Sequence, residues 1–132
     1  MPTTSPGAID TMRILAKSRP LRSLKAGEVI FRSGELGDCL YGVVNGTVKL
    51  AWDSDGLDGK FETIPEGSCF GVGALVQPEH RRFGTATALT DTQLLVMNRE
   101  EFLFALQELP MFGLEMLHAL DERLRGLKKL RA

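Results

Sequence analysis

Histidine and cysteine are scarce in this chain, and their scarcity limits the chemistry that it can perform. The 132 residues include two histidines, His80 and His118, and two cysteines, Cys39 and Cys69. Neither histidine has a partner at the spacing of a metal site, so no metal centre is predicted. No Ser-His-Asp or Cys-His arrangement is suggested, and we predict that the protein is not an enzyme. We expect Cys39 and Cys69 to be buried thiols, with a disulfide between them as the alternative.

The chain also lacks a large net charge and any long apolar run. Its formal net charge is −1, so it has no overall basic field for nucleic acid or for an anionic membrane. No run of about 18 apolar residues predicts a transmembrane helix. No uninterrupted apolar segment near the N-terminus predicts a secretory signal. We expect a protein of the cytoplasm that makes no direct contact with nucleic acid or membrane.

Glycine, in contrast, is abundant, with 14 residues spread between short apolar segments. After a helix expected over residues 8–17, seven or eight β-prone segments follow at close spacing. Asn45-Gly46 is a strong hairpin signal, and residues 85–89 and 93–97 are predicted to form another hairpin. Such spacing favours an antiparallel barrel or sandwich. We predict a single domain with an N-terminal tail and helix over 1–20, a β-roll over 21–97 and C-terminal helices over 98–132.

Two helices are expected at the C-terminal end. Asn98 is a predicted N-cap, and Pro110 either ends the first helix or begins the second. The apolar stripe of the first helix is predicted to comprise Phe102, Leu103, Leu106 and Leu109. The second helix is long, and a 3-4-3 spacing typical of a coiled-coil seam links Leu117, Leu120, Leu124 and Leu127. This seam predicts a homodimer; the alternative is that the helix packs on its own barrel.

The stretch from Gly67 to Ala88 is a candidate anion cradle. The amides from Gly71 to Leu75, including those of Gly73 and Ala74, begin a short helix after an apolar strand. Glycine lets a ligand approach the backbone, and helix N-termini attract anions. Arg82 follows, and its guanidinium can grip a phosphate with two parallel hydrogen bonds. The alternative is a glycine-rich turn with solvated arginines.

Taken together, these segments resemble the cyclic nucleotide-binding domain, in particular the sensor domains of the catabolite activator protein (Crp/Fnr) family. The first matching segment, residues 27–49, reads GEVIFRSGELGDCLYGVVNGTVK. The second, residues 67–71, reads GSCFG, and the third, residues 88–97, reads ALTDTQLLVM. The resemblance covers roughly Leu21 to Leu130. It implies a mainly β fold: an antiparallel double-stranded β-helix, or jelly roll, with a short N-terminal helix and two C-terminal helices.

The resemblance also identifies residues 71–84 as the phosphate-binding cassette of that family, in a degenerate form. Gly71 falls on the family's glycine, and Arg82 on the arginine that holds the cyclic phosphate. Val72 falls on the glutamate that accepts the ribose 2′-hydroxyl, Phe83 on the serine or threonine that serves the phosphate, and Gly84 on an alanine. Because valine has no acceptor, a buried 2′-hydroxyl would be left unpaired, at a cost of roughly 1–3 kcal/mol.

The resemblance thus implies a regulatory sensor module, homodimeric through its C-terminal helix. The implied ligand is a cyclic nucleotide or another anion, and no other cofactor is expected. The implied ligand-binding residues are Gly71, Val72, Gly73, Ala74, Arg82, Phe83 and Gly84. Two alternatives stay open: a genuine cAMP- or cGMP-binding domain of a transcription regulator, and a ligand-free dimerisation scaffold. No DNA-binding domain is expected in this chain.

Overall fold

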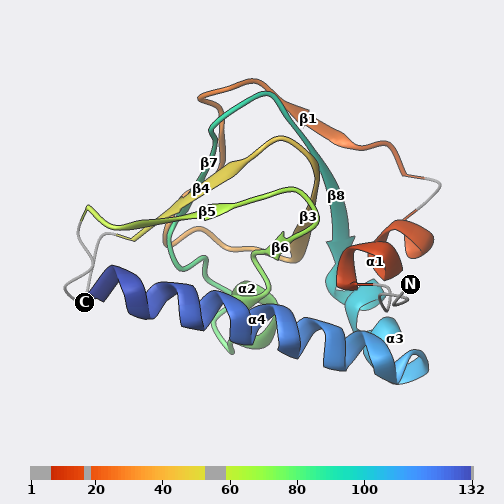
Figure 1. Cartoon of the computed structure of the whole chain (residues 1–132). Coiled ribbons are helices and arrows are strands. Elements are labelled where there is room, and N and C mark those ends of the chain that lie inside the picture. Colours follow the sequence, from red (N-terminus) through yellow and green to blue (C-terminus); the bar gives the residue numbers. More distant parts are fainter. Residues whose placement is uncertain (1–6, 17–18, 53–58, 132) are drawn as a thin grey trace, which may run out of the picture.

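The computed structural model describes residues 7–16, 19–52 and 59–131, without the side chains of the last four. The predicted N-terminal tail lies mostly outside these residues. Two antiparallel four-stranded sheets face each other, which confirms the predicted jelly roll (Figure 1). One sheet has the order β1 (Arg22–Leu24), β8 (Thr92–Asn98), β3 (Cys39–Asn45) and β6 (Cys69–Phe70). The other has the order β2 (Val29–Phe31), β7 (Thr85–Ala88), β4 (Val48–Ala51) and β5 (Phe61–Ile64).

The prediction of two local hairpins, at Asn45-Gly46 and around residue 91, was wrong. At each turn the chain passes from one sheet to the other, so β3 does not pair with β4, nor β7 with β8. The two turns pack on each other instead: Leu89 N donates to Thr47 O at 2.9 Å. Gly46 has a φ of +94°, and a methyl group there would lie 2.5 Å from the carbonyl oxygen of Asp91. Glycine at this position is therefore required by the contact between turns as well as by the backbone conformation.

Apolar residues that alternate along the strands fill the space between the two sheets. In β4, Val48 and Leu50 are buried while Lys49 and Ala51 are half-buried, as in a strand that turns one face toward the core. The aromatic rings of Phe31, Tyr41 and Phe70 meet at one end of this core. Their ring centroids are 5.3–6.1 Å apart, a spacing that favours aromatic pairs beyond their buried area.

In the part of the chain that the structure describes, four helices lie outside the roll, and three of them cover the sheet that contains β3 and β8. These are α1 (Ala8–Leu15), α3 (Arg99–Glu108) and the first half of α4 (Pro110–Arg131); the short α2 (Gly73–Val76) follows β6. Helix α4 then continues along the roll, beside the edge strands β5 and β6 (Figure 1). Among the described residues, no helix combines the length and hydropathy that crossing a bilayer requires.

The start of α3 was predicted correctly, but its apolar stripe was not. Asn98 is the N-cap, and its side chain accepts from Glu101 N at 2.8 Å. Only Phe102 and Ala105 of α3 are buried against the core. The predicted stripe residues Leu103, Leu106 and Leu109 are exposed. The sequence pattern failed because an alanine, not a leucine, occupies the position closest to the neighbouring elements. Pro110 begins α4, which was one of the two expected roles.

Candidate functional site

The cassette joins β6 to β7 and folds back over the loop between β2 and β3. Gly71 has a φ of +89°, so the chain can turn sharply as it leaves β6. Arg82 N donates to Glu35 O at 2.7 Å, and Gly34 N donates to Arg82 O at 2.9 Å. These bonds fix which of the two adjacent arginines enters the roll. Arg81 points outward and donates to Gly34 O, whereas Arg82 points inward.

The guanidinium of Arg82 is enclosed by the cassette and by the aromatic end of the core. The residue is 5 % exposed. Its Nη1 donates to the carbonyl oxygen of Gly71, and its Nη2 to that of Cys39, both at 2.8 Å. The guanidinium carbon lies 4.4 Å from the ring centroid of Phe31 and 5.6 Å from that of Tyr41. Aromatic faces stabilise a cation at such distances.

No carboxylate among the described residues forms an ion pair with Arg82. Its charge is therefore balanced only by carbonyl dipoles and ring faces, although burying an ionised group is costly. A site with a buried cation and no counter-ion attracts an anion. This is the chemical property that distinguishes the cassette from an ordinary glycine-rich turn.

Two glycines provide the space for this guanidinium. A methyl group at Gly37 would overlap Arg82 Nε, and one at Gly71 would lie 2.9 Å from Arg82 Nη1. Real Cβ atoms do not come so close, so either substitution would force the arginine to move. Gly37 of the first matching segment and Gly71 of the second thus provide room for the arginine.

The other predicted ligand-binding residues do not converge on the guanidinium in the same way. Val72 is half-buried and packs against the apolar cluster under the helices, while the exposed Phe83 has 58 % of its surface accessible. Ala74 is buried and Gly73 half-buried within α2. Gly84 is required by the backbone, because its φ is +102° and a methyl group would lie 2.9 Å from Ala51 O.

Both histidines interact with neighbouring residues of the chain. His80 is half-buried, and its Nδ1 lies 2.8 Å from the carbonyl oxygen of Ala74. It also has a φ of +53°, which is unusual for a residue with a side chain. His118 is exposed on α4 beside Glu122. No three His, Cys, Asp or Glu residues in the described ranges form a group that could hold a metal ion.

Several residues around Arg82 were missed by the sequence prediction. Cys39 and Tyr41 lie in β3 and Phe31 in β2, far from the cassette in sequence. Burial, followed by the hydrogen bond with Cys39, raises the pKa of Tyr41 to about 12, so its hydroxyl stays neutral. Both cysteines are free thiols. Cys69 is buried as expected, and burial raises the pKa of its thiol to about 12, whereas Cys39 is half-buried.

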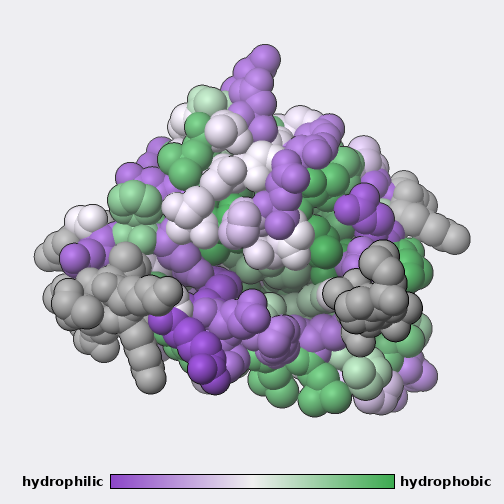
Figure 2. Space-filling model, viewed as in Figure 1, coloured by the Kyte–Doolittle hydropathy of each residue, from purple (hydrophilic) through white to green (hydrophobic). Residues whose placement is uncertain are grey.

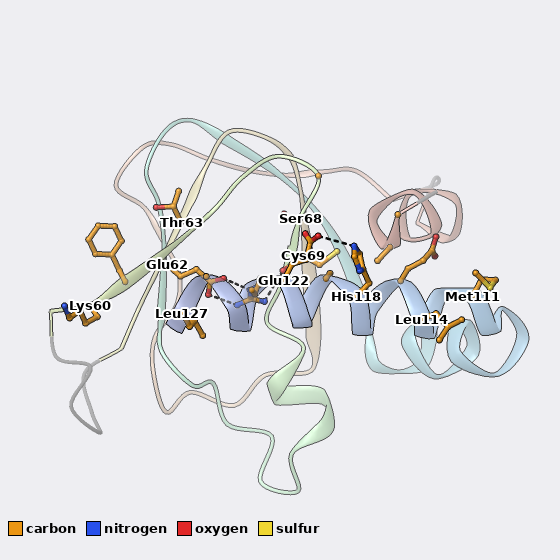
Figure 3. A pocket seen from close by; sticks show the side chains of 18 of the residues that line it. Lys60, Glu62, Thr63, Ser68, Cys69, Met111, Leu114, His118, Glu122 and Leu127 are labelled. Carbon is orange, nitrogen blue, oxygen red and sulfur yellow. Dashed lines mark hydrogen bonds and ion pairs between the residues drawn. The ribbon is translucent and has the colours of Figure 1, made fainter. Parts of the chain in front are cut away.

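A separate pocket of about 1070 Å³ lies between α4 and the edge strands β5 and β6. It opens on the face shown in Figure 2 as a hollow above α4, with hydrophilic side chains along its lower edge. Glu62 lines it from β5, Cys69 from β6 and Ser68 from the residue before β6, while His118 and Arg123 line it from α4 (Figure 3). None of the predicted cassette residues lines this pocket.

The four leucines of the predicted dimer seam lie in two different environments. Leu117 and Leu124 are exposed, at 64 % and 60 %. Leu120 is half-buried, and Leu127 is half-buried against the core between the two sheets of the same chain. The structure therefore leaves Leu117 and Leu124, seven residues apart on one side of α4, without cover from the described residues of this chain.

The fold and the enclosed arginine can now be compared with known proteins. Residues 21–108, two thirds of the chain, match the family model of the cyclic nucleotide-binding domain. The chain belongs to this family. It is 34% identical over 100 residues to the cyclic AMP receptor protein of Thermus thermophilus, which covers 75% of this chain and 46% of that protein. The chain thus spans less than half the length of this curated relative.

Solved structures of related proteins share the fold. The catabolite activator protein of Thermus thermophilus superposes with a TM-score of 0.69 at 29% identity, over 94% of this chain and 57% of that one. The sensor domain of a transcriptional regulator from Pseudomonas aeruginosa superposes with a TM-score of 0.66 at 26% identity, over 87% of this chain and 77% of that one. The resemblance inferred from residues 27–49, 67–71 and 88–97 is therefore confirmed.

Proposed function

We propose that the chain is a regulatory sensor domain that binds a small anionic, nucleotide-like ligand at Arg82. The observation that carries this proposal is a buried guanidinium with no carboxylate partner among the described residues. An anionic ligand would supply the missing charge through two parallel hydrogen bonds, which are strong between ionised groups. Both cysteines are free thiols, in keeping with the cytoplasmic location that we propose.

Binding at Arg82 would change the two strands that the arginine now holds together. Without ligand, Arg82 links the carbonyl of Gly71, directly after β6, to that of Cys39 in β3. An anion is a better acceptor than either carbonyl, and both would be released when the guanidinium turns toward it. The cassette could then shift relative to the roll, and this shift is the signal that a sensor passes to its partner.

The ligand would be recognised mainly by its charge. Val72 offers no acceptor for a ribose hydroxyl, and Phe83 offers no hydroxyl donor for a phosphate. The relatives named above include a cyclic AMP receptor protein, so cyclic nucleotides are the first ligands to test. We expect weaker binding than a cassette with both polar side chains would give, because each lost hydrogen bond is worth about 1 kcal/mol.

Isothermal titration with cAMP, cGMP and inorganic phosphate tests this proposal. We expect heat from at least one of the three, and loss of this heat in Arg82→Lys, which keeps the charge but not the two-pronged geometry. The matched control is Arg81→Lys, because Arg81 is adjacent but points outward. Absence of heat with all three ligands, or equal binding by the Arg82→Lys protein, would contradict the proposal. Circular dichroism establishes that both variants are folded.

We also propose that the domain is a homodimer through the outer side of α4. The exposed Leu117 and Leu124, with the exposed Leu114, form an apolar strip that a second copy could cover. We expect a dimer mass by light scattering and a monomer mass for the Leu117→Asp/Leu124→Asp double variant. Ile14→Asp, at an equally exposed position on α1, should leave the dimer intact. A monomeric wild-type protein, or a double variant that still dimerises, would contradict this assignment.

A further inference from the structure

The two halves of α4 are held in different ways. In the first half, Phe112 and Met116 are buried in the apolar cluster beneath α1 and α3. In the second half, up to residue 127, no residue is buried, and the side chains that face the roll are only half-covered. In the second half, the half-buried Leu127 packs against the core between the two sheets, but no apolar side chain is fully buried as Phe112 and Met116 are in the first half.

Among the residues of α4 whose side chains the structure describes, one ion pair connects the second half of the helix to the roll. Arg123 Nε donates to Glu62 Oε1 at 2.6 Å, and Nη2 donates to Oε2 at 3.0 Å, so the pair is bidentate. Arg123 Nη1 also lies 3.3 Å from the carbonyl oxygen of Cys69, which accepts from it. Through one side chain, α4 is thus attached to both edge strands, β5 through Glu62 and β6 through Cys69.

This pair is protected from solvent to an extent that a neighbouring pair on the same helix is not. The side chains of Arg123 and Glu62 are 23 % and 12 % exposed, whereas those of Arg125 and Asp121 are 76 % and 57 % exposed. Exposed pairs contribute little because water screens them, and removal of one partner of a covered pair leaves an uncompensated charge. We therefore expect that the loss of Arg123 destabilises this region and that the loss of Arg125 does not.

The pair also stands inside the pocket of about 1070 Å³ between α4 and the strands, and both residues line it. Figure 3 shows Glu62 reaching from β5 toward α4, with Cys69 and Ser68 farther along the helix on the side of His118. The helix is thus bridged to the roll across a gap that apolar side chains do not fill. If the bridge broke, the half-buried Leu127 would be the main apolar contact left between this half of the helix and the roll among the described residues.

We propose that the Glu62–Arg123 ion pair is a latch that holds the second half of α4 against the roll. Its release lets this half of the helix swing away from β5 and β6 while the first half stays anchored by Phe112 and Met116. The latch is also close to the cassette along the chain. Cys69, whose carbonyl oxygen accepts from Arg123, lies two residues before Gly71, whose carbonyl oxygen accepts from Arg82. It does not depend on which ligand binds, so it is testable in the protein without ligand.

Amide hydrogen exchange of the full chain, without ligand, tests the latch. In Glu62→Gln and in Arg123→Met, amides of residues 119–127 should exchange about tenfold faster than in the wild-type protein. This factor follows because the stabilisation lost with this ion pair lies between the values for an exposed and for a buried pair. Amides of α3 and β8 should keep their wild-type rates. Arg125→Met is the matched control and should change nothing in residues 119–127.

Two results would overturn the latch. The first is an unchanged rate for residues 119–127 in both Glu62→Gln and Arg123→Met. The second is an equal acceleration in α3 and β8, which would mean that the pair supports the whole fold and not one half of a helix. If Arg123→Met does not fold, Glu62→Gln still decides, because it keeps the size of the side chain. Neither result bears on ligand binding at Arg82, so the two proposals fail separately.

Discussion

Arg82 in the cassette and Arg123 on α4 are both shielded from solvent, but their charges are balanced in different ways. Arg123 has a bidentate carboxylate partner, Glu62, so its charge is already neutralised within the chain. Arg82 is more deeply buried but donates to two main-chain carbonyls and has no carboxylate partner among the described residues. Burial alone therefore does not distinguish the two arginines. Arg82 differs in having no carboxylate partner among the described residues, and this difference is the basis on which we propose that it binds an anion.

The comparison predicts a large difference in stability between the two arginines. Arg82→Met removes the donors of the Gly71 and Cys39 carbonyls and should lower the free energy of unfolding by about 3–5 kcal/mol. Arg123→Met should lower it by only about 1–2 kcal/mol, because its surroundings open to water. Urea unfolding followed by circular dichroism measures both. Equal losses would mean that the two arginines are not held in different ways.

The space around Arg82 can be tested without changing the arginine. Gly37→Ala places a methyl group on Arg82 Nε and should cost about 1–3 kcal/mol through overpacking. Gly126→Ala is the contrasting variant, because nothing lies within 4 Å of a methyl group there. On a helix this change should stabilise the protein by up to about 1 kcal/mol. Thermal unfolding checks both, and a harmless Gly37→Ala would show that the guanidinium is not confined.

A hydrogen-bond acceptor placed at residue 72 should raise the affinity of the site for a nucleotide. Val72→Glu offers a carboxylate to a ribose hydroxyl, and we expect the affinity for cAMP to rise about tenfold, the value of one charge-assisted hydrogen bond. Val76→Glu adds the same charge at an exposed position of α2 and serves as the control. Titration calorimetry compares them. A gain that is equal in both variants, or absent from Val72→Glu, would argue against a ribose beside this residue.

The smallest expected effect on the free energy of unfolding concerns a third arginine, Arg19. Arg19 forms a bidentate pair with Glu101 at 2.8 and 2.9 Å, near the surface. Burial raises the pKa of Glu101, but hydrogen bonds from Arg19 and from the Asn98 amide outweigh it and lower the pKa below its usual 4.5. The pair therefore stabilises the fold above pH 4.5, and this contribution is lost as the pH falls further.

The magnitude of that contribution is below about 1 kcal/mol, as for other partly exposed pairs. The unfolding free energy of Glu101→Gln and of wild-type protein, measured between pH 7 and pH 3, checks the direction. The difference between them should shrink as the pH falls. A difference that grows toward acid pH would mean that the carboxylate is held in its neutral form.

The sequence was sufficient for the jelly roll and for the inward arginine, but not for the partners of that arginine. Turn residues and strand alternation act locally, so the strands and the N-cap at Asn98 could be predicted. The two wrong hairpins, at Asn45-Gly46 and near residue 91, arose because a tight turn does not determine which sheet the next strand joins. That choice is made by contacts between turns far apart in sequence, such as Leu89 with Thr47.

The candidate site shows the same limit. Residues 71–84 were predicted from a motif, whereas Cys39 and Tyr41 are brought to Arg82 only by the pairing of β3 with β6. The Glu62–Arg123 pair joins residues 61 positions apart and carries no local pattern. The predicted stripe of α3 failed for a related reason, because burial of Ala105 in place of Leu106 is decided by how closely neighbouring elements approach.

The central claim is that the charge of Arg82 is available to an anion. The most direct measurement is a nuclear magnetic resonance titration of backbone amides and arginine Nε–H groups with cAMP, cGMP and inorganic phosphate. We expect saturable shifts at Arg82 and at residues 71–75, present in Arg81→Lys and absent from Arg82→Lys. Spectra that do not change with any of the three ligands, or shifts that persist in Arg82→Lys, would contradict it.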